Sequence, residues 1–264
     1  MNRDGNLDLL KKMNVKSDVI LINQTSINSY NSYDFQSYTI KERSSTERGL
    51  SNSRNMGLSM VSGDIVCLSD DDVIYTDSYR QDIIAEFDKH PNADAIFFNL
   101  KTIPENSDRE SNWIKSYKRV GRIDARNYGS VHLAFRVNKW KKNKVYFDPR
   151  FGAGAFYNCG EDTIFVKKLM DNNFKIYKSP ICIGIVDMST SSWFNGYNRK
   201  YFYNKGALIG ALYPMLGTAL IFILTVKNSV SKLGSISNFF TLYEWYNEGY
   251  RDFLKHNDFK CLNK

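Results

Sequence analysis

Three consecutive carboxylates, Asp70-Asp71-Asp72, directly follow the apolar run 64–69 (DIVCLS). This run predicts a buried strand, and ligands of open α/β sheets bind at the carboxyl ends of strands. Adjacent carboxylates repel one another unless a cation or solvent compensates, and their oxygens suit hard divalent cations such as Mg²⁺ or Mn²⁺. A solvated acidic turn explains the three residues equally well when they are taken alone. An EF-hand loop is excluded, because no Gly and terminal Glu follow at the required spacing.

A second acidic motif, Gly160-Glu161-Asp162, stands at the start of a helix predicted over residues 161–170. The positive end of a helix dipole favours the ionised form of a carboxylate in the first turn. A carboxylate in such a place can act as a general base if a substrate hydroxyl comes within reach. An ordinary acidic helix cap is the alternative interpretation of Glu161 and Asp162 on their own.

Apolar runs and turn residues indicate an α/β protein with a mostly parallel sheet over residues 1–190. Residues 24–34 and 101–112 are expected to be loops, and residues 131–147 fit a strand and a helix equally well. The remainder, 191–264, is helical and different in character. The predicted strands are 18–23, 37–41, 64–69, 95–100, 174–177 and 181–186, and the predicted helices are 52–61, 77–89, 161–170 and 242–254.

The order of these motifs resembles the inverting glycosyltransferases of family 2. That family shares Gly, then Arg-Asn, then Gly, then Gly-Asp, then a strand ending in Asp-x-Asp. Here the run 47–57 (ERGLSNSRNMG) is followed by Gly63-Asp64 and by the strand ending in Asp70-Asp71-Asp72, and Gly160-Glu161-Asp162 matches the family's Gly-Glu-Asp motif. The resemblance covers about residues 1–190. It implies a GT-A fold, a nucleotide-sugar donor and a divalent metal, Mn²⁺ or Mg²⁺.

The resemblance also implies roles for individual residues. Asp162 would take the proton from the acceptor hydroxyl, and Glu161 would hold the acceptor. Asp72 would ligate the metal, with Asp70 and Asp187 completing the set. The implied donor-binding residues are Asp70, Asp71, Arg54 and Asn23, and Trp193 would stack against the acceptor sugar. A structural helix arginine, a turn carboxylate and a core or interfacial tryptophan are the alternatives for Arg54, Asp187 and Trp193.

The sequence departs from the family at its beginning. Relatives begin with a buried strand, and Met1-Asn2-Arg3 matches only the end of it, so the first strand is expected to be absent. A central strand is hard to lose from a parallel sheet, and we therefore expect the true start to lie upstream, with Met1 an internal methionine. Relatives also carry an acidic pair where this chain has Asn23-Gln24. That pair usually helps to hold the base of the nucleotide, so the way in which this chain recognises the nucleotide base stays open.

An uncharged segment, residues 206–226, lies between Lys205 and Lys227. Its length meets the roughly 20 apolar residues that a bilayer span needs. Pro214 removes a backbone donor near the middle and predicts two short helices, neither of which can span. We expect a shallow hairpin in the cytoplasmic leaflet, assisted by basic flanks such as Arg199 and Lys200. A buried pair of core helices is the alternative.

Composition limits the class of protein. Hydrophobic residues make up 42% and charged residues 24%, which excludes collagen-like, coiled-coil and wholly disordered chains. The net charge of +8 suits an anionic partner: a nucleotide diphosphate, a nucleic acid or a membrane face. Four scattered cysteines and three histidines give little support to a zinc site. Together with the lack of an export signal, they point to the reducing cytoplasm.

The sequence therefore predicts a metal-dependent inverting glycosyltransferase at the cytoplasmic membrane face. It would transfer sugar from a nucleotide-diphosphate sugar, a UDP-sugar by expectation, to a lipid-linked glycan of a bacterial surface polysaccharide. A sugar-phosphate nucleotidyltransferase is an alternative, although no Gly-rich phosphate loop is visible. A non-catalytic protein that binds nucleic acid or membrane through the basic run 139–144 is another, but ordered acidic motifs do not suit a nucleic-acid groove.

Overall fold

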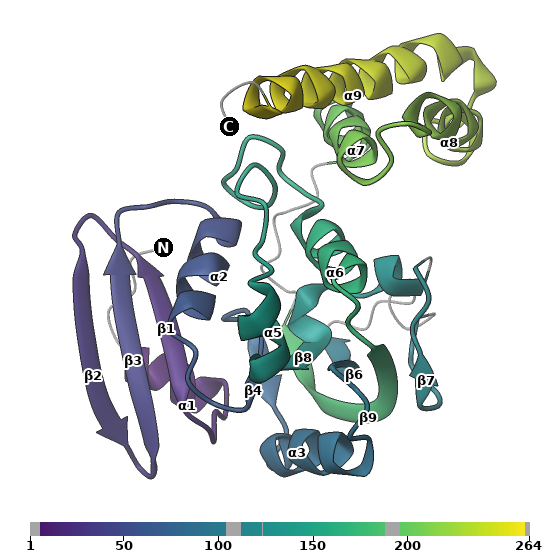
Figure 1. Ribbon diagram of the computed structural model, residues 1–264. Coiled ribbons are helices and arrows are strands. Elements are labelled where there is room, and N and C mark those ends of the chain that lie inside the picture. Colours follow the sequence, from purple (N-terminus) through teal and green to yellow (C-terminus); the bar gives the residue numbers. More distant parts are fainter. Residues whose placement is uncertain (1–5, 104–111, 123, 188–195, 262–264) are drawn as a thin grey trace.

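A computed structural model describes residues 6–103, 112–122, 124–187 and 196–261 of the chain. Two β-sheets and the helices packed on them form an α/β body, and three C-terminal helices lie together at one end of it (Figure 1). The two parts correspond to the predicted regions 1–190 and 191–264. That division stays an interpretation.

The first sheet has three strands in the order β1-β3-β2. Strand β1 (Val19–Gln24) is parallel to β3 (Tyr38–Ser45), and β2 (Ser29–Phe35) is antiparallel to β3. The predicted loop over 24–34 is therefore wrong, because β2 and β3 form a hairpin that turns at Gln36, where φ is +56°. The side chains of β2 are mostly exposed, so backbone pairing forms this strand without an apolar face that the sequence could reveal.

The second sheet has the order β4-β8-β6-β9-β5, with β7 beside β9. Its strands are mixed in direction, and of the described pairs within it only β6 with β9 is parallel. The expectation of a mostly parallel sheet is therefore wrong, since apolar runs predict a buried strand but not its direction. The two strands predicted before Asp187 are one continuous strand, β9. The strand bounds are β4 Ile65–Cys67, β5 Val73–Tyr75, β6 Ala95–Ile103, β7 Lys118–Arg119, β8 Leu133–Arg136 and β9 Ile176–Asp187.

Strands β1 and β4 are edge strands of the two described sheets, and their apolar side chains are only half-buried. Helix α2 (Leu50–Ser59) packs on β1 through Gly57 and joins the core of the second sheet through Leu58. The two sheets are therefore not hydrogen-bonded to each other, and α2 connects them by packing on both. The absent first strand stays a prediction, and residues 1–3 lie outside the described part of the chain.

Two apolar cores lie on the second sheet. One contains Phe97, Phe135 and Phe165 and packs beneath α6 (Glu161–Asp171); the other contains Phe87 and packs beneath α3 (Tyr79–Lys89). Both helices begin within two residues of their predicted starts. The ambiguous stretch 131–147 contains a strand followed by a short helix, because β8 leads directly into α5. The remaining elements of the body are α1 Asn6–Lys12, α5 Val137–Asn143 and the 3₁₀ turns η1 Asp124–Asn127 and η2 Ser130–His132.

The C-terminal part contains α7 (Arg199–Leu212), α8 (Gly217–Ser231), the 3₁₀ turn η3 (Ile236–Asn238) and α9 (Phe239–Cys261). The uncharged segment breaks around Pro214, as predicted, and the helix predicted over 242–254 lies within α9. Within the described residues, no helix has both the length and the apolarity to cross a membrane.

The two halves of the uncharged segment have different environments. Residues of α7 such as Ala207, Ile209 and Leu212 are buried in the protein. Apolar residues of α8 such as Phe222 and Ile223 are exposed. A hairpin lying wholly in a lipid leaflet is therefore wrong for the first half, which is core, and only the second half remains available to a partner.

Helices α7 and α9 cross at two glycines. A Cβ added to Gly206 would lie 2.0 Å from the carbonyl oxygen of Tyr246, and one added to Gly249 would lie 1.9 Å from that of Tyr203. Neither helix can carry a side chain at the crossing without moving apart. The absence of a side chain, rather than a special backbone angle, makes these glycines necessary.

Gly249→Ala is expected to lower the free energy of unfolding by about 1–3 kcal/mol, because overpacking outweighs the gain in helix propensity. Gly57→Ala in α2 is the matched control, since its Cβ would meet Ile22 at an ordinary 3.6 Å. That variant should be neutral or stabilised by up to about 1 kcal/mol. Thermal or urea unfolding measures both, and equal effects in the two variants would contradict the close crossing.

Candidate active site

The guanidinium of Arg54 joins the two acidic motifs. Its Nη2 lies 2.8 Å from Asp70 Oδ1, its Nη1 lies 2.7 Å from Asp162 Oδ1, and its side chain is only 8% exposed. Burial alone would lower the pKa of Arg54, but Asp70 and Asp162 outweigh it and raise that pKa above its usual value. Arg54 is thus a permanent cation held between two carboxylates that lie 92 positions apart in the chain.

Helix α2, which carries Arg54, is hydrogen-bonded to residues 147–151, the segment that precedes the second acidic motif. Its Ser51 hydroxyl donates to the carbonyl of Phe151 at 2.6 Å. The Asn55 side chain donates to the carbonyl of Phe147 at 3.0 Å and accepts from its N–H at 2.8 Å. The Arg-Asn pair of the motif therefore divides two tasks, because Arg54 reaches the carboxylates while Asn55 anchors the helix that carries it.

Asp162 uses one carboxylate oxygen for its fixed partners. Besides Arg54, the hydroxyl of Ser130 donates to Asp162 Oδ1, at 2.6 Å. Both bonds end on Oδ1, which leaves the lone pairs of Oδ2 for another proton donor. A Cβ at Gly129 would lie 3.2 Å from Oδ2, so a side chain at this position would crowd that oxygen. The side chain of Asp162 is 27% exposed and can be reached from solvent.

The start of α6 is set by Gly160, whose φ of +104° is a conformation that L side chains rarely adopt. A Cβ there would also lie 2.7 Å from Leu208 of α7. The hydroxyl of Tyr157, three residues before Gly160, donates to Asp252 of α9 at 2.8 Å. The hydroxyl of Tyr203 in α7 donates to the same carboxylate at 2.7 Å. The C-terminal helices therefore position the turn that presents Glu161 and Asp162.

Glu161 has an unusual protonation equilibrium. Burial, followed by the charge of Asp162, raises the pKa of Glu161 to about 7, although Arg54 opposes the shift. Its side chain packs against Gly152, where a Cβ would approach within 3.2 Å. The raised pKa favours the protonated form of this carboxyl, which can donate a hydrogen bond as well as accept one.

The acidic run and the end of β9 are adjacent. The N–H of Asp187 donates to the carbonyl of Asp72 at 2.9 Å, where β5 and β9 pair. Among the described residues, no group of three or more His, Cys, Asp or Glu side chains is gathered closely enough to hold a metal unaided. Two neighbouring aspartates nevertheless fit Mg²⁺ or Mn²⁺, because such ions take one or two carboxylates and complete their shell with water and substrate phosphates.

The remaining predicted residues are less closely tied to this network. Asp71 is exposed in the turn before β5, and Asn23 lies in β1, paired with Ser44. Trp193 lies outside the described residues, and its acceptor role stays a prediction. Sequence reasoning missed Ser130, which no motif marks, because it reaches Asp162 only through the tertiary fold.

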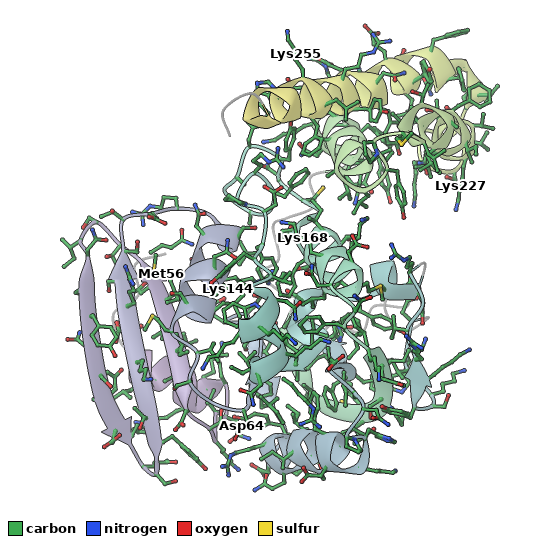
Figure 2. The ribbon with its side chains drawn as sticks, in the orientation of Figure 1. Met56, Asp64, Lys144, Lys168, Lys227 and Lys255 are labelled. Carbon is green, nitrogen blue, oxygen red and sulfur yellow. The ribbon has the colours of Figure 1, made fainter. Side chains whose placement is uncertain are left out.

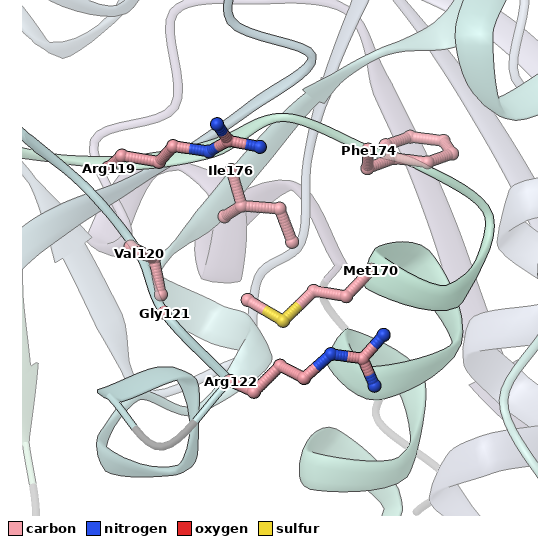
Figure 3. Close-up of a pocket in the computed structure, with 7 residues that line it drawn as sticks. All are labelled: Arg119, Val120, Gly121, Arg122, Met170, Phe174 and Ile176. Carbon is pink, nitrogen blue, oxygen red and sulfur yellow. The ribbon is translucent and has the colours of Figure 1, made fainter.

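A separate cavity of about 440 Å³ lies at the far end of α6 from Glu161 and Asp162. Figure 3 shows its apolar floor of Met170, Phe174 and Ile176, with Arg119 and Arg122 at its rim. Arg122 makes an ion pair with Asp171 at 3.0 Å. None of its lining residues belongs to the acidic network, and we assign the chemistry to that network rather than to this cavity.

Comparison with known proteins agrees with the motifs. The family model of glycosyl transferase family 2 matches residues 17–156, which is more than half of the chain. The chain belongs to glycosyl transferase family 2. The match includes Arg54 and the acidic run, and it ends before Gly160. The protein is thus a glycosyltransferase, as the sequence predicted. A search of curated proteins finds no match.

Solved structures show the same fold. TarS 1–349 of S. aureus in complex with UDP-GlcNAc matches with a TM-score of 0.60 at 16% identity, covering 94% of this chain and 76% of that one. TarS 1–349 alone matches with a TM-score of 0.58 at 16% identity, covering 88% and 71%. The predicted GT-A fold is confirmed, together with its helical C-terminal region.

The raised pKa of Glu161 makes stability depend on pH. Between about pH 4.5 and 7 the folded chain binds more protons at Glu161 than the unfolded chain, so its stability falls as the pH rises through that window. Glu161→Gln should remove this loss and stabilise the protein by up to about 3 kcal/mol at about pH 8, with little gain at about pH 5.

Thermal unfolding at both pH values measures the difference. Glu244→Gln, at an exposed position of α9, is the matched control and should change stability equally at both. A difference between wild type and Glu161→Gln that does not vary with pH would contradict the shifted pKa.

Proposed function

We propose that this family 2 enzyme transfers a sugar with inversion, with Asp162 as the general base and Asp70, Asp71 and Arg54 on the donor side. The observation that carries the proposal is the double ion pair of Arg54 with Asp70 and Asp162. By the resemblance, Asp70 belongs to the donor side and Asp162 to the acceptor side. The side chain of Arg54 contacts both carboxylates, so the two sides of the proposed reaction are adjacent.

The geometry supports a single displacement. Asp162 Oδ2 accepts the proton of an acceptor hydroxyl, whose oxygen attacks the anomeric carbon as the bond from that carbon to the diphosphate oxygen breaks. The proton ends on Asp162, the electron pair leaves with the nucleoside diphosphate, and the configuration inverts. Arg54 and Ser130 hold Oδ1 meanwhile, so the carboxylate keeps its orientation.

A divalent cation, Mn²⁺ or Mg²⁺, is part of the proposal. Asp72 and Asp187 would hold it, with Asp70 nearby, and it would supply positive charge to the departing diphosphate. Glu161 is proposed to hold the acceptor by a hydrogen bond, for which a carboxyl with a raised pKa is suited. Trp193 is proposed as the stacking face for the acceptor sugar.

A UDP-sugar is the proposed donor class, because the similar S. aureus TarS structure was solved with UDP-GlcNAc. Recognition of the base differs from the family pattern. Asn23 is proposed to contact the donor, while the amide of neighbouring Gln24 is already engaged with Ser53 at 2.6 Å and with Gly49.

The proposed acceptor is a glycan, lipid-linked and destined for a bacterial surface polysaccharide, met at the cytoplasmic face of the membrane. The exposed apolar residues of α8 support that location. Nucleic acid is not a proposed partner. In the basic run 139–144, Trp140 is buried and its indole donates to Val145 at 2.6 Å, so part of that run serves the core.

Asp162→Asn is expected to lower nucleotide release from the donor by about 10²-fold or more, with donor affinity nearly unchanged. Asparagine keeps an oxygen for Arg54 and Ser130 but cannot take the proton. A thermal-shift screen of nucleotide sugars with and without Mn²⁺ first selects the donor, and steady-state kinetics then measure turnover. Rates within about threefold of wild type would remove Asp162 from the role of base.

Asp72→Asn is expected to abolish the part of donor binding that depends on Mn²⁺. The fold should remain intact, since removing one charge from a repulsive acidic run leaves the metal-free protein as stable or slightly more so. Titration calorimetry with donor, with and without Mn²⁺, measures the effect. Asp162→Asn serves as its control, because that variant should keep the full Mn²⁺ dependence. An unchanged dependence in Asp72→Asn would exclude Asp72 as a ligand.

A further inference from the structure

Helix α8 has an unusual distribution of side chains. The residues that it buries stand at every fourth position, and three of the four are small or polar: Gly217, Thr225 and Ser229, together with Ile221. The hydroxyls of Thr225 and Ser229 donate to carbonyls of their own helix, at 2.7 and 2.8 Å, so they need no partner on α9. Apart from Ile221, this buried face lacks large apolar residues, while Phe222 and Ile223 point outward and are more than half exposed. A helix packed for water turns its apolar stripe inward and a polar face outward, so the outer face of α8 fits lipid better than water.

The large apolar side chains form one continuous surface, which we call the α8 ridge. Phe222, Ile223, Val226 and Val230 share one side of the helix because of their helical spacing. Met215 and Leu216 extend the ridge at one end. Phe240 extends it at the other, beside Phe239, whose ring lies 5.6 Å from that of Phe222. Met215 is 95% exposed, Phe240 82% and Phe222 55%.

The charged residues of α8 and of the turn that follows it are both cations, Lys227 and Lys232. Arg199 of α7 does not add to them, because it is ion-paired with Glu248 of α9. Lys227 is exposed beside Val226, on the side of α8 that faces away from α9 (Figure 2). An apolar ridge bordered by cations complements an anionic lipid surface, where acyl chains lie beneath negative headgroups.

We propose that the α8 ridge inserts into the headgroup region of an anionic lipid leaflet, with α8 lying in the plane of the membrane. Fifteen residues give a helix of roughly 22 Å, shorter than the hydrocarbon core of about 30 Å, so the helix lies on the bilayer and does not cross it. This inference rests on the membrane location proposed above and not on sugar transfer.

A second copy of the chain is a poorer occupant of the α8 ridge. A symmetric dimer would place the same patch of each subunit against the other and so bring the two copies of Lys227 towards each other. With no acidic residue in 196–243, the patch has no complementary charge of its own to offer. Like charges facing one another disfavour such an interface.

Co-sedimentation of the full chain with vesicles tests the proposal. Vesicles of phosphatidylcholine mixed with phosphatidylglycerol should bind the protein, and vesicles of phosphatidylcholine alone should bind it less. Added salt should weaken the binding without abolishing it. The double variant Phe222→Ser, Ile223→Ser should lose about tenfold or more in binding. Lys227→Glu should lose binding to the mixed vesicles only.

Ile84→Ser is the matched control, since Ile84 is an exposed apolar residue of α3 in the α/β body. It should bind vesicles like the wild type. All variants alter exposed residues, and circular dichroism checks that each is folded. Donor hydrolysis in solution, without vesicles, should be the same in the ridge variants, which separates failure of this inference from failure of the proposed function.

Two results would overturn the proposal. One is equal vesicle binding by the wild type and the Phe222→Ser, Ile223→Ser variant. The other is a wild-type protein that does not bind vesicles and forms a dimer that this variant dissociates, as light scattering would show; the α8 ridge would then be a contact between copies.

Discussion

The structure depends on burying one positive charge, that of Arg54. An isolated buried guanidinium would be prohibitive, and the two carboxylates of Asp70 and Asp162 offset that cost. Arg54 lies on α2, Asp70 follows β4, and Asp162 lies in the first turn of α6, so the same cation fixes three elements relative to one another. Losing Arg54 would leave two carboxylates without their shared cation, and losing either aspartate would leave the buried guanidinium with one carboxylate partner instead of two. The site is therefore held together by these ion pairs, in a region where the two sheets do not pair with each other and helices connect them.

A charge held this tightly needs a rigid frame, and the chain supplies it from both sides. On one side Asn55 and Ser51 bond α2 to the backbone of Phe147 and Phe151. On the other side, Asp252 of α9 accepts hydrogen bonds from the hydroxyls of Tyr157 and Tyr203. Tyr157 lies three residues before Gly160. The C-terminal helices are thus part of the frame of the active site. They determine where the first turn of α6, with Glu161 and Asp162, can point.

Much of the site was predictable from the sequence, because its residues stand at ends of elements that apolar runs and glycines mark. The ordered motifs singled out Arg54 as a donor-binding residue, and Asp70 and Asp162 as residues of the site. The ion pairs that join Arg54 to both carboxylates were not predicted. Other features had no local signal. Strand β2 is polar on both faces, and strand direction is not encoded in an apolar run. Ser130 meets Asp162 only across the fold. The two halves of the uncharged segment 206–226 are both apolar in sequence, although only the half in α7 is core. That difference depends on the close approach at Gly206 and Gly249, which two glycines in a sequence do not reveal.

Helix α7 connects the acidic network with the α8 ridge. Its Leu208 packs against Gly160 at the start of α6, its Gly206 packs against α9, and α8 follows after Pro214. Through these contacts α7 joins the start of α6 to the other C-terminal helices. A leaflet that held α8 would therefore also limit the height of Asp162 above the headgroups. An acceptor anchored in the same leaflet would approach Oδ2 from one direction only, and its hydroxyl would be selected by its distance from the lipid as well as by its chemistry.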